Sequence, residues 1–560
     1  MDVTSSPIHR DNSRGLLADL PSYRTSRHSL SRSRPSVASE NMEPLMENSI
    51  PALPLEMDAV RINAVVALRI PASLAIRREL LPFAIWQHRV FVACANLSDA
   101  TGLAAVQRGF TEKLIPVLAE RESLRRAVRR VYVGSRSGPR ETRIGRALSR
   151  AGQTSAAGRA VSTRQVSGTH EGVDIAELSE ELLTAAQLRE ASDIHLDPDA
   201  DGLRIRFRVD GALEDVHRLP RELFQPLLNR FKVMAEMDIA EKRAPQDGGF
   251  RRPVQSIGRS IDIRAATLPT QWGERMTLRL LGLQTGALTL TRLGMSANQL
   301  ACFETALGQP EGMILLTGPT GSGKSTTLYA GVRHMLEREV LHVITIEDPI
   351  EYSIAGVAQV AVDSADKTSF TKALRSALRH DPDVVMIGEV RDGETAGTAV
   401  KASLTGHLVL STLHTSSAAG TVTRLADMGV ERYLIASTLR LSVAQRLVRR
   451  LCPRCRRARK LTGRESAGLG HPEAEGITIY EPGGCLYCGG RGFLGRLALF
   501  ELLPIDEEAG DVITRAGSEE ELNRTMKRQS MPFLRDDALS KLIQGETCWG
   551  DVQAVIALHN

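Results

Sequence analysis

Apolar and polar positions alternate along the chain in patterns that change from region to region. Between residues 59 and 133, the short apolar runs Ala64–Leu68 and Val90–Ala93 predict strands. In the same region, Asp99–Gln107 and Glu122–Val131 carry apolar residues at helical spacing. Together these patterns predict a small α/β domain near the N-terminus.

Two stretches lack a sustained apolar period. Residues 1–58 hold many Ser and Arg and few aromatic residues, so they offer little apolar surface to offset the entropy of ordering the chain, and we expect a disordered leader. Residues 134–172 contain seven Arg among many Gly, Ser and Ala, which predicts a flexible basic linker. Contact of this linker with anionic lipid or nucleic acid is the alternative, although a solvated tether is the commoner role.

A second folded region is predicted over residues 173–288. Apolar residues between Ile175 and Leu188 recur at helical spacing, which predicts an amphipathic helix. From Leu203 to Val209, apolar and charged residues alternate strictly, so every second side chain lies on one face, as in a half-buried strand. This region is therefore also expected to be α/β.

Residues 289–450 carry a repeated pattern of short apolar runs. Four of these runs are strand candidates, and helical or loop segments separate them: Met313–Thr317, His342–Ile346, Val384–Ile387 and Leu408–Ser411. Such spacing predicts a mostly parallel sheet covered by helices. Because 560 residues exceed what one hydrophobic core usually supports, we expect an α/β protein of several domains.

The most specific chemical motif directly follows the first of these strands. Residues 318–325 read Gly-Pro-Thr-Gly-Ser-Gly-Lys-Ser, and a stretch compatible with a helix follows. Glycines let backbone N–H groups turn toward a polyphosphate, and the helix offers its positive N-terminal end. Lys324 is then expected on the β- and γ-phosphates and Ser325 on Mg²⁺, which makes ATP the expected ligand. The predicted nucleotide-binding residues are Gly318, Pro319, Thr320, Gly321, Ser322, Gly323, Lys324, Ser325 and Thr326.

Two acidic residues stand at the ends of later strand candidates. Glu389 ends the run that begins at Asp383, and Glu347 lies in an acidic cluster that Pro349 keeps out of a helix. A carboxylate at such a position can support Mg²⁺ or orient the attacking water. Glu389 is the stronger candidate for such a role, but either Glu347 or Glu389 could polarise the attacking water, and the pattern does not choose between them.

Two histidines flank the strand candidate Leu408–Ser411. His407 precedes the strand and His414 follows it, so only one of them can lie at the end of the strand where the phosphates bind. We expect His414, which stands among threonines beyond the strand, to contact the γ-phosphate.

Four of the seven cysteines form two C-x-x-C pairs. The first pair is Cys452 and Cys455, the second is Cys485 and Cys488, and 29 residues separate the two pairs. Four thiolates at this spacing predict a closed, structural Zn²⁺ site, because no coordination position stays open for a substrate. A redox pair is the less favoured interpretation.

Composition adds three exclusions to this picture. Lys and Arg number 71 against 66 Asp and Glu, so the net charge of +5 gives no general reason to expect binding to nucleic acid. No run approaches the roughly 18–20 apolar residues of a membrane-spanning helix. The N-terminus also lacks the apolar core of a signal peptide, so a cytoplasmic protein is expected.

Taken in order, the motifs resemble those of the bacterial secretion ATPase superfamily, the motor ATPases of type II secretion and type IV pilus assembly. The resemblance covers roughly residues 59–505. It rests on the phosphate loop, the histidine box that spans Thr405–Thr415, the paired C-x-x-C and these further segments: Ser192–Pro198, Glu241–Gly248, Pro269–Thr270, Gly273–Arg275, Thr345–Glu351 and Gly388–Glu389. Gly249 and Ala266 depart from the usual pattern, outside the segments that contact phosphate.

The resemblance implies a hexameric ring that couples ATP hydrolysis to assembly of a pseudopilus or pilus. Arg264 and Arg279 match the arginines that the domain before the core contributes to the nucleotide, so they join the catalytic candidates Glu347, Glu389 and His414. The paired cysteines favour the assembly type of motor. The implied location is the cytoplasmic face of the inner membrane, where the N-terminal domain would dock on the cytoplasmic domain of a platform protein. Type II secretion is the leading expectation for the process that the motor drives, and type IV pilus extension is the alternative.

The resemblance also implies a RecA-like P-loop core preceded by a PAS-like α/β domain. The predicted divisions are a leader (1–58), an N-terminal docking domain (59–133), a linker (134–172), an arginine-supplying α/β domain (173–288), the ATPase core (289–450), a zinc insert (451–497) and a C-terminal helical region (498–560).

Two other classes of function compete with a secretion motor. A DNA-translocating motor would need basic and aromatic residues around a channel, yet aromatic residues make up 4% of the chain and the basic run lies in the linker. A scaffold that binds ATP without hydrolysing it would not need the full set of acids and histidines.

Overall fold

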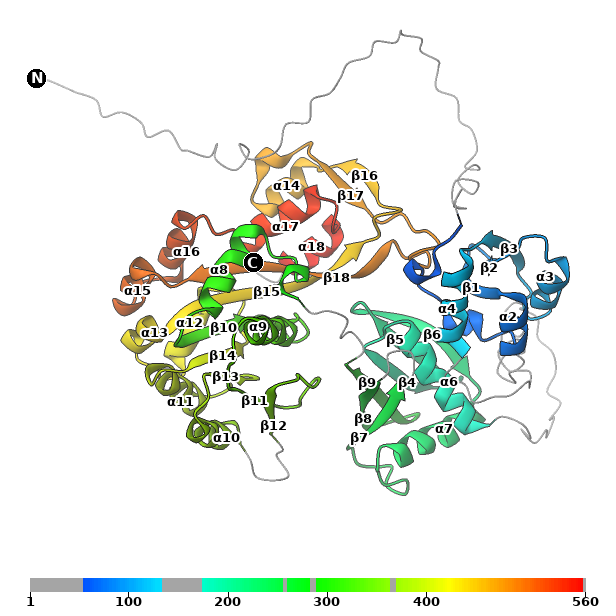
Figure 1. Ribbon diagram of the computed structural model, residues 1–560, viewed down its shortest axis with the longest axis horizontal. Helices are drawn as coiled ribbons and strands as arrows, with labels where there is room; N and C mark the ends of the chain where they lie inside the picture. The colour runs from blue at the N-terminus through cyan, green and yellow to red at the C-terminus, as the bar shows by residue number, and fades with distance from the viewer. Residues whose placement is uncertain (1–53, 133–173, 255–258, 283–288, 363–368, 557–560) are drawn as a thin grey trace, which may run out of the picture. The chain divides into compact units, whose positions relative to one another are not determined.

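The computed structural model describes residues 54–132, 174–254, 259–282, 289–362 and 369–556 (Figure 1). Residues 1–53 of the predicted leader and the predicted linker 134–172 lie outside the described residues. Within these ranges, no helix is both long enough and apolar enough to cross a lipid bilayer.

The N-terminal domain is a three-stranded sheet with short helices. Its strands stand in the order β1-β2-β3, with β1 and β2 antiparallel and β2 and β3 parallel. The elements are η2 (Met57–Ala59), α1 (Ala64–Ala67), α2 (Ala72–Arg78), β1 (Leu80–Trp86), β2 (Arg89–Cys94), α3 (Ala100–Gln107), β3 (Lys113–Leu118) and α4 (Arg121–Tyr132). The predicted strand β2 and the predicted helices α3 and α4 are confirmed, and the Asp99 side chain caps α3 by accepting from the Gly102 N–H.

Two features of this domain differ from expectation. The predicted strand at Ala64–Leu68 is wrong, because the segment forms the helical turn α1, in which Val66 and Ala67 donate to the Asn63 carbonyl. An apolar run this short has no period that separates a strand from a buried helical turn. Leu55 and Met57, which the sequence assigned to the leader, are fully buried in this domain, and the Leu55 N–H donates to the Leu118 carbonyl.

The second domain is a six-stranded antiparallel sheet with two helices. The strand order is β6-β5-β4-β9-β8-β7, and α7 packs against β5 and β7. Its elements are α6 (Ile175–Leu188), β4 (Asp193–Asp199), β5 (Gly202–Val209), β6 (Ala212–Leu219), α7 (Arg221–Met234), β7 (Gln246–Val254), β8 (Arg259–Thr270) and β9 (Gly273–Leu281). The predicted amphipathic helix and alternating strand are confirmed as α6 and β5.

The core domain is built on a seven-stranded sheet in the order β12-β11-β13-β14-β10-β15-β18. All neighbours pair in parallel except β15 and β18, which are antiparallel. The strands are β10 (Gly312–Thr317), β11 (Val343–Glu347), β12 (Val357–Ala361), β13 (Val384–Ile387), β14 (Leu408–Leu413), β15 (Leu439–Leu451) and β18 (Phe493–Pro504). The four predicted strands are confirmed as β10, β11, β13 and β14, and the carboxyl ends of these parallel strands share one edge of the sheet.

Helices cover both faces of this sheet (Figure 1). Alternate residues of β10 face opposite sides: Met313 and Leu315 join one apolar cluster, and Ile314 and Leu316 join the other. Helices α8 (Ala297–Leu307) and α9 (Lys324–Arg338) contribute to the second cluster. The first cluster includes residues of α10 (Phe370–Ala377), α11 (Gly393–Leu404), α12 (Gly420–Asp427) and α13 (Arg432–Thr438), while η4 (Leu290–Arg292) and η5 (Leu378–His380) are short turns.

The cysteine-containing insert lies between β15 and β18. It contains β16 (Arg457–Lys460), α14 (Gly463–Leu469), η6 (Pro472–Ala474) and β17 (Thr478–Glu481), with β16 and β17 antiparallel. The chain then returns through β18, which crosses the predicted division at residue 497 and completes the core sheet. Four helices follow: α15 (Glu507–Thr514), α16 (Glu519–Arg528), α17 (Leu534–Ile543) and α18 (Trp549–Ile556).

Candidate functional site

The predicted phosphate loop connects β10 to α9 at the carboxyl edge of the core sheet. β10 ends at Thr317 and α9 begins at Lys324, as the motif requires. Gly318 and Gly323 have φ angles of 145° and 89°, in the region that favours glycine. A Cβ on Gly318 would lie 2.4 Å from the Gln445 carbonyl oxygen, so the loop could not keep this path with a larger residue.

Lys324 and Ser322 turn polar atoms into this loop. The Lys324 Nζ donates to the carbonyl oxygens of Gly318 at 2.7 Å and Pro319 at 3.1 Å. Burial lowers the pKa of Lys324 to about 8, while the nearby Glu389 carboxylate opposes that shift. The buried Ser322 Oγ has no hydrogen-bond partner among the described residues. A buried hydroxyl without a partner, an ammonium and a helix N-terminus together fit the oxygens of a polyphosphate.

Glu389 and His414 lie beside the loop on neighbouring strands. Glu389 follows β13 by two residues and His414 directly follows β14, which lies between β13 and β10. The His414 Nε2 is 3.4 Å from the Glu389 Oε2, and Arg391 forms an ion pair with the same carboxylate. Burial alone would raise the pKa of Glu389, but Arg391 and His414 outweigh it and hold this pKa below its ordinary value. Glu389 is therefore an ionised acceptor at the edge where the phosphates are expected.

Glu347 occupies a different environment at the end of β11. It is 3% exposed, and its carboxylate accepts hydrogen bonds from Tyr329, from the Thr345 Oγ1 at 2.5 Å and from the Gln359 Nε2 at 3.1 Å. A carboxylate with this many protein donors has little free capacity to accept from a water molecule. Between the two acids that the sequence left open, the geometry favours Glu389 as the residue that orients the water.

Arg264 and Arg279 stand opposite each other on β8 and β9. Both side chains are exposed, and the Arg279 Nε donates to the Asp193 Oδ1 at 2.9 Å. Burial raises the pKa of Glu351, in the acidic cluster after β11, and the two guanidinium groups oppose that rise. Within the described ranges, neither arginine hydrogen-bonds to the phosphate loop, so their contribution to a nucleotide stays a prediction.

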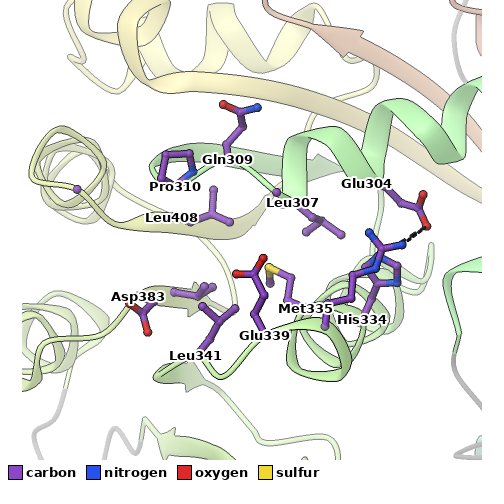
Figure 2. A pocket seen from close by; sticks show the side chains of 14 residues that line it. Glu304, Leu307, Gln309, Pro310, His334, Met335, Glu339, Leu341, Asp383 and Leu408 are labelled. Atoms are coloured by element: carbon purple, nitrogen blue, oxygen red, sulfur yellow. Dashed lines mark ion pairs between the residues drawn. The ribbon is translucent and has the colours of Figure 1, made fainter.

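The opposite edge of the sheet carries no predicted site residue. His407, at the start of β14, lies there with its Nδ1 3.0 Å from the Ala402 carbonyl oxygen. This edge also holds a hollow of about 430 Å³, shown in Figure 2. Its walls include Glu304 of α8 and His334 of α9, whose side chains are 3.6 Å apart. This hollow and the candidate catalytic groups are therefore at opposite ends of the parallel strands.

The four paired cysteines converge as predicted. Their sulfur atoms all lie within 4.8 Å of one another, and three of the distances are 3.8 Å: Cys452 to Cys485, Cys455 to Cys488 and Cys485 to Cys488. Sulfur atoms about 2.3 Å from a tetrahedral Zn²⁺ ion are about 3.8 Å apart, so the cluster fits this metal. The distances are far above the roughly 2.05 Å of a disulfide bond, and all four are free thiols.

Sequence reasoning missed two residues that contact the phosphate loop. Gln445 and Arg446 lie on β15, and their partners on the loop and on α9 are more than 100 residues earlier in the chain. The one signal available was a pair of large polar residues between apolar neighbours, in the segment Val443-Ala444-Gln445-Arg446-Leu447-Val448.

The chain is similar to known proteins over most of its length. The family model described as Type II/IV secretion system protein matches residues 169–554, and the MshEN domain model matches residues 49–138. Type II secretion system protein E of Pseudomonas aeruginosa is 41% identical over 490 residues, which cover 87% of this chain and 96% of that protein. Type II secretion system ATPase E of Vibrio cholerae is 46% identical over 365 residues, which cover 65% of this chain and 72% of that protein.

A solved structure shares the fold. The X-ray structure of the Legionella pneumophila ATPase DotB aligns with a TM-score of 0.51 at 25% identity, over 68% of this chain and 95% of that one. The mixed α/β fold expected from the sequence, with a RecA-like core, is confirmed.

Proposed function

Because the chain belongs to the family of Type II/IV secretion system proteins and is an ATPase, we propose that it is the motor of a type II secretion system. One observation carries the proposal. The phosphate loop, Glu389 and His414 meet at the carboxyl edge of one largely parallel sheet, in a chain whose curated relatives are named for type II secretion. Type IV pilus extension is the alternative service for the same chemistry.

The proposal gives each of these residues a distinct role in hydrolysis. The loop N–H groups, Ser322 and Lys324 would bind the β- and γ-phosphates, and Ser325 at the start of α9 would hold Mg²⁺. When bound, Mg²⁺ neutralises charge on the phosphate oxygens. Glu389 would orient the attacking water as an ionised acceptor, and His414 would contact the γ-phosphate from the neighbouring strand.

The assembly follows as a further part of the proposal. Arg264 and Arg279 are exposed on the second domain, where the nucleotide of a neighbouring subunit in a hexamer would reach them. A trans arginine can raise the rate of hydrolysis by about 10³–10⁵-fold, so an isolated subunit should be slow. The MshEN-type domain would dock on the cytoplasmic domain of a platform protein, and this contact would hold the motor at the inner membrane.

The four thiolates would bind Zn²⁺ in a structural role. The cluster lies in the insert between β15 and the return strand β18, on chain segments separate from those that carry Glu389 and His414. We therefore expect the metal to fold the insert without taking part in hydrolysis.

The test measures phosphate release across a wide range of protein concentration, with Lys324→Ala as the control. Specific activity that rises with concentration supports completion of the site between subunits. Flat activity from a protein that sizing shows to be monomeric contradicts the proposed ring. Deletion of the gene in its host then distinguishes type II secretion from type IV pilus extension, because loss of exported enzymes with intact pili indicates type II secretion.

A further inference from the structure

Strand β15 extends past the end of its neighbour β10. The last aligned pair is Thr317 with Ala444, and the phosphate loop starts one residue later. Gln445 and Arg446 therefore flank the first residues of the loop. Because successive side chains of a strand point to opposite faces, Gln445 lies on the α9 face and Arg446 on the face of the segment that follows β14.

Gln445 braces the last glycine of the loop against α9. Its side chain is buried, and its Oε1 accepts a hydrogen bond from the Thr327 Oγ1 at 2.9 Å. A Cβ on Gly323 would lie 2.8 Å from the Gln445 Nε2, so the amide is in close contact with the loop backbone. One side chain thus fixes the end of the loop and the first turn of α9 in the same relative position.

Arg446 lies between the phosphate loop and the segment that follows β14. It is 5% exposed, and its Nη2 donates to the Ser416 carbonyl oxygen at 2.7 Å. Its Nη1 donates to the Gln445 carbonyl oxygen at 2.9 Å and would lie 2.8 Å from a Cβ on Gly318. Ser416 follows His414 by two residues. The planar guanidinium group therefore sets the distance between the phosphate loop and the segment that presents His414.

Glu501 secures the far side of the same segment. It lies on β18 opposite Ala444, and its carboxylate accepts from the Ala418 N–H at 2.9 Å and from the Leu534 N–H at 3.3 Å. Burial raises the pKa of Glu501, and the charge of Arg446 opposes that rise. The segment from His414 to Ala418 is thus held by Arg446 at one residue and by Glu501 at another.

We propose that Gln445 and Arg446 are positioning residues for ATP hydrolysis. Gln445 keeps the phosphate loop in shape, and Arg446 ties the loop to the segment that carries His414. The inference rests on the proposed function of the same site. ADP binding needs the phosphate loop alone, whereas hydrolysis needs both loops at a fixed separation, so loss of Arg446 should lower kcat more than affinity for ADP.

The first test compares Arg446→Gln with Arg440→Gln. Arg440 lies on the same strand but at the opposite edge of the sheet, where it donates to the carbonyl oxygens of Ser437 and Glu311. We expect Arg446→Gln to lower kcat by about 10- to 100-fold while the Kd for ADP, measured by calorimetry, changes less than about threefold. Arg440→Gln should match the wild type. An unchanged kcat in Arg446→Gln, or an equal loss of kcat and ADP affinity, would overturn the role of Arg446.

A second pair of variants tests Gln445 even if Arg446→Gln does not fold. Thr327→Val removes the hydroxyl that donates to Gln445 and leaves the side-chain volume nearly unchanged. Thr327→Ser keeps the hydroxyl. We expect Thr327→Val to weaken ADP binding by about fivefold and Thr327→Ser to stay close to the wild type. Equal behaviour of the two variants would exclude the Gln445 contact as the cause.

Failure of the proposed function has a different signature. It would appear as a wild-type protein without Lys324-dependent phosphate release. The inference fails separately, when the wild type is active and the Arg446 and Thr327 variants match it.

Discussion

The phosphate loop and the cysteine cluster are both marked by short sequence motifs, but the structure builds them in opposite ways. The phosphate loop depends on backbone path: Gly318 and Gly323 need positive φ angles, and β15 lies against the loop from outside. The cysteine cluster depends on four side chains within one insert. A site of the first kind can lose a side chain and keep its fold, whereas a site of the second kind loses its local fold with its ligands.

The largest effect on activity is expected from Lys324→Ala. Removing the ammonium should lower phosphate release by at least about 100-fold, because it takes away a charge that stabilises the transferring phosphate. The melting temperature should stay close to that of the wild type, since the loop path is set by its glycines and by β15. A parallel loss of melting temperature would break the comparison, because the side chain would then be needed for the fold.

Glu389 and Glu347 are expected to have different roles, the first in catalysis and the second in stabilising the fold. Glu389→Gln should lower kcat by about 100-fold with little change in ADP affinity, because Glu389 is a partly exposed, ionised acceptor. Glu347→Gln should instead lower the melting temperature, because the new amide cannot accept from Tyr329, Thr345 and Gln359 together. Paired measurements of kcat and melting temperature check the assignment. A larger loss of kcat in Glu347→Gln would reverse it.

Cys455→Ser should remove zinc and unfold the insert while nucleotide binding persists. The remaining three thiolates leave the tetrahedral site incomplete. Metal analysis and limited proteolysis of residues 451–497 follow the insert, and ADP titration follows the core. Cys302→Ser is the matched control, since Cys302 lies on α8 outside the cluster. Full zinc content and unchanged proteolysis in Cys455→Ser would contradict the prediction.

The smallest expected effect concerns the attachment of the insert to the C-terminal helices. The His471 Nε2 lies 2.7 Å from the Asp536 Oδ1 of α17, and this contact, with help from Glu473, raises the pKa of His471. The stabilisation is therefore fully present below the ordinary histidine pKa of about 6.5 and is lost as the pH rises through the folded value. The free energy of unfolding of the wild type should exceed that of His471→Gln by about 1 kcal/mol or less at pH 6, and the difference should be smaller at pH 9. Thermal melts at both values test the sign.

The predictable parts of the site are each marked by a local sequence pattern. The phosphate loop is eight consecutive residues, and Glu389 and His414 each follow a short apolar strand. Parallel topology then brings those strand ends together, so a local pattern was enough to place them. The cysteine cluster needed only two pairs of known spacing.

The parts that were missed are long-range contacts without a local motif. Thr327 and Gln445 are 118 residues apart, and Ser416 and Arg446 are 30 apart. Their contacts depend on β15 being the neighbour of β10, which periodicity does not reveal. The helical turn at Ala64–Ala67 was misassigned for the opposite reason, because the segment is too short to show a period at all.

The antiparallel pairing of β15 and β18 determines where the insert joins the core sheet. The pairing runs from Leu441 with Pro504 to Leu451 with Phe493, so the insert occupies the tip of a long hairpin. A segment at such a tip can change in length or sequence without removing a hydrogen bond from the sheet. A change of length at this tip therefore leaves the hydrogen bonds of the core sheet in place, whereas the buried Leu461, Leu469 and Ile479 anchor the insert in the apolar cluster on one face of that sheet.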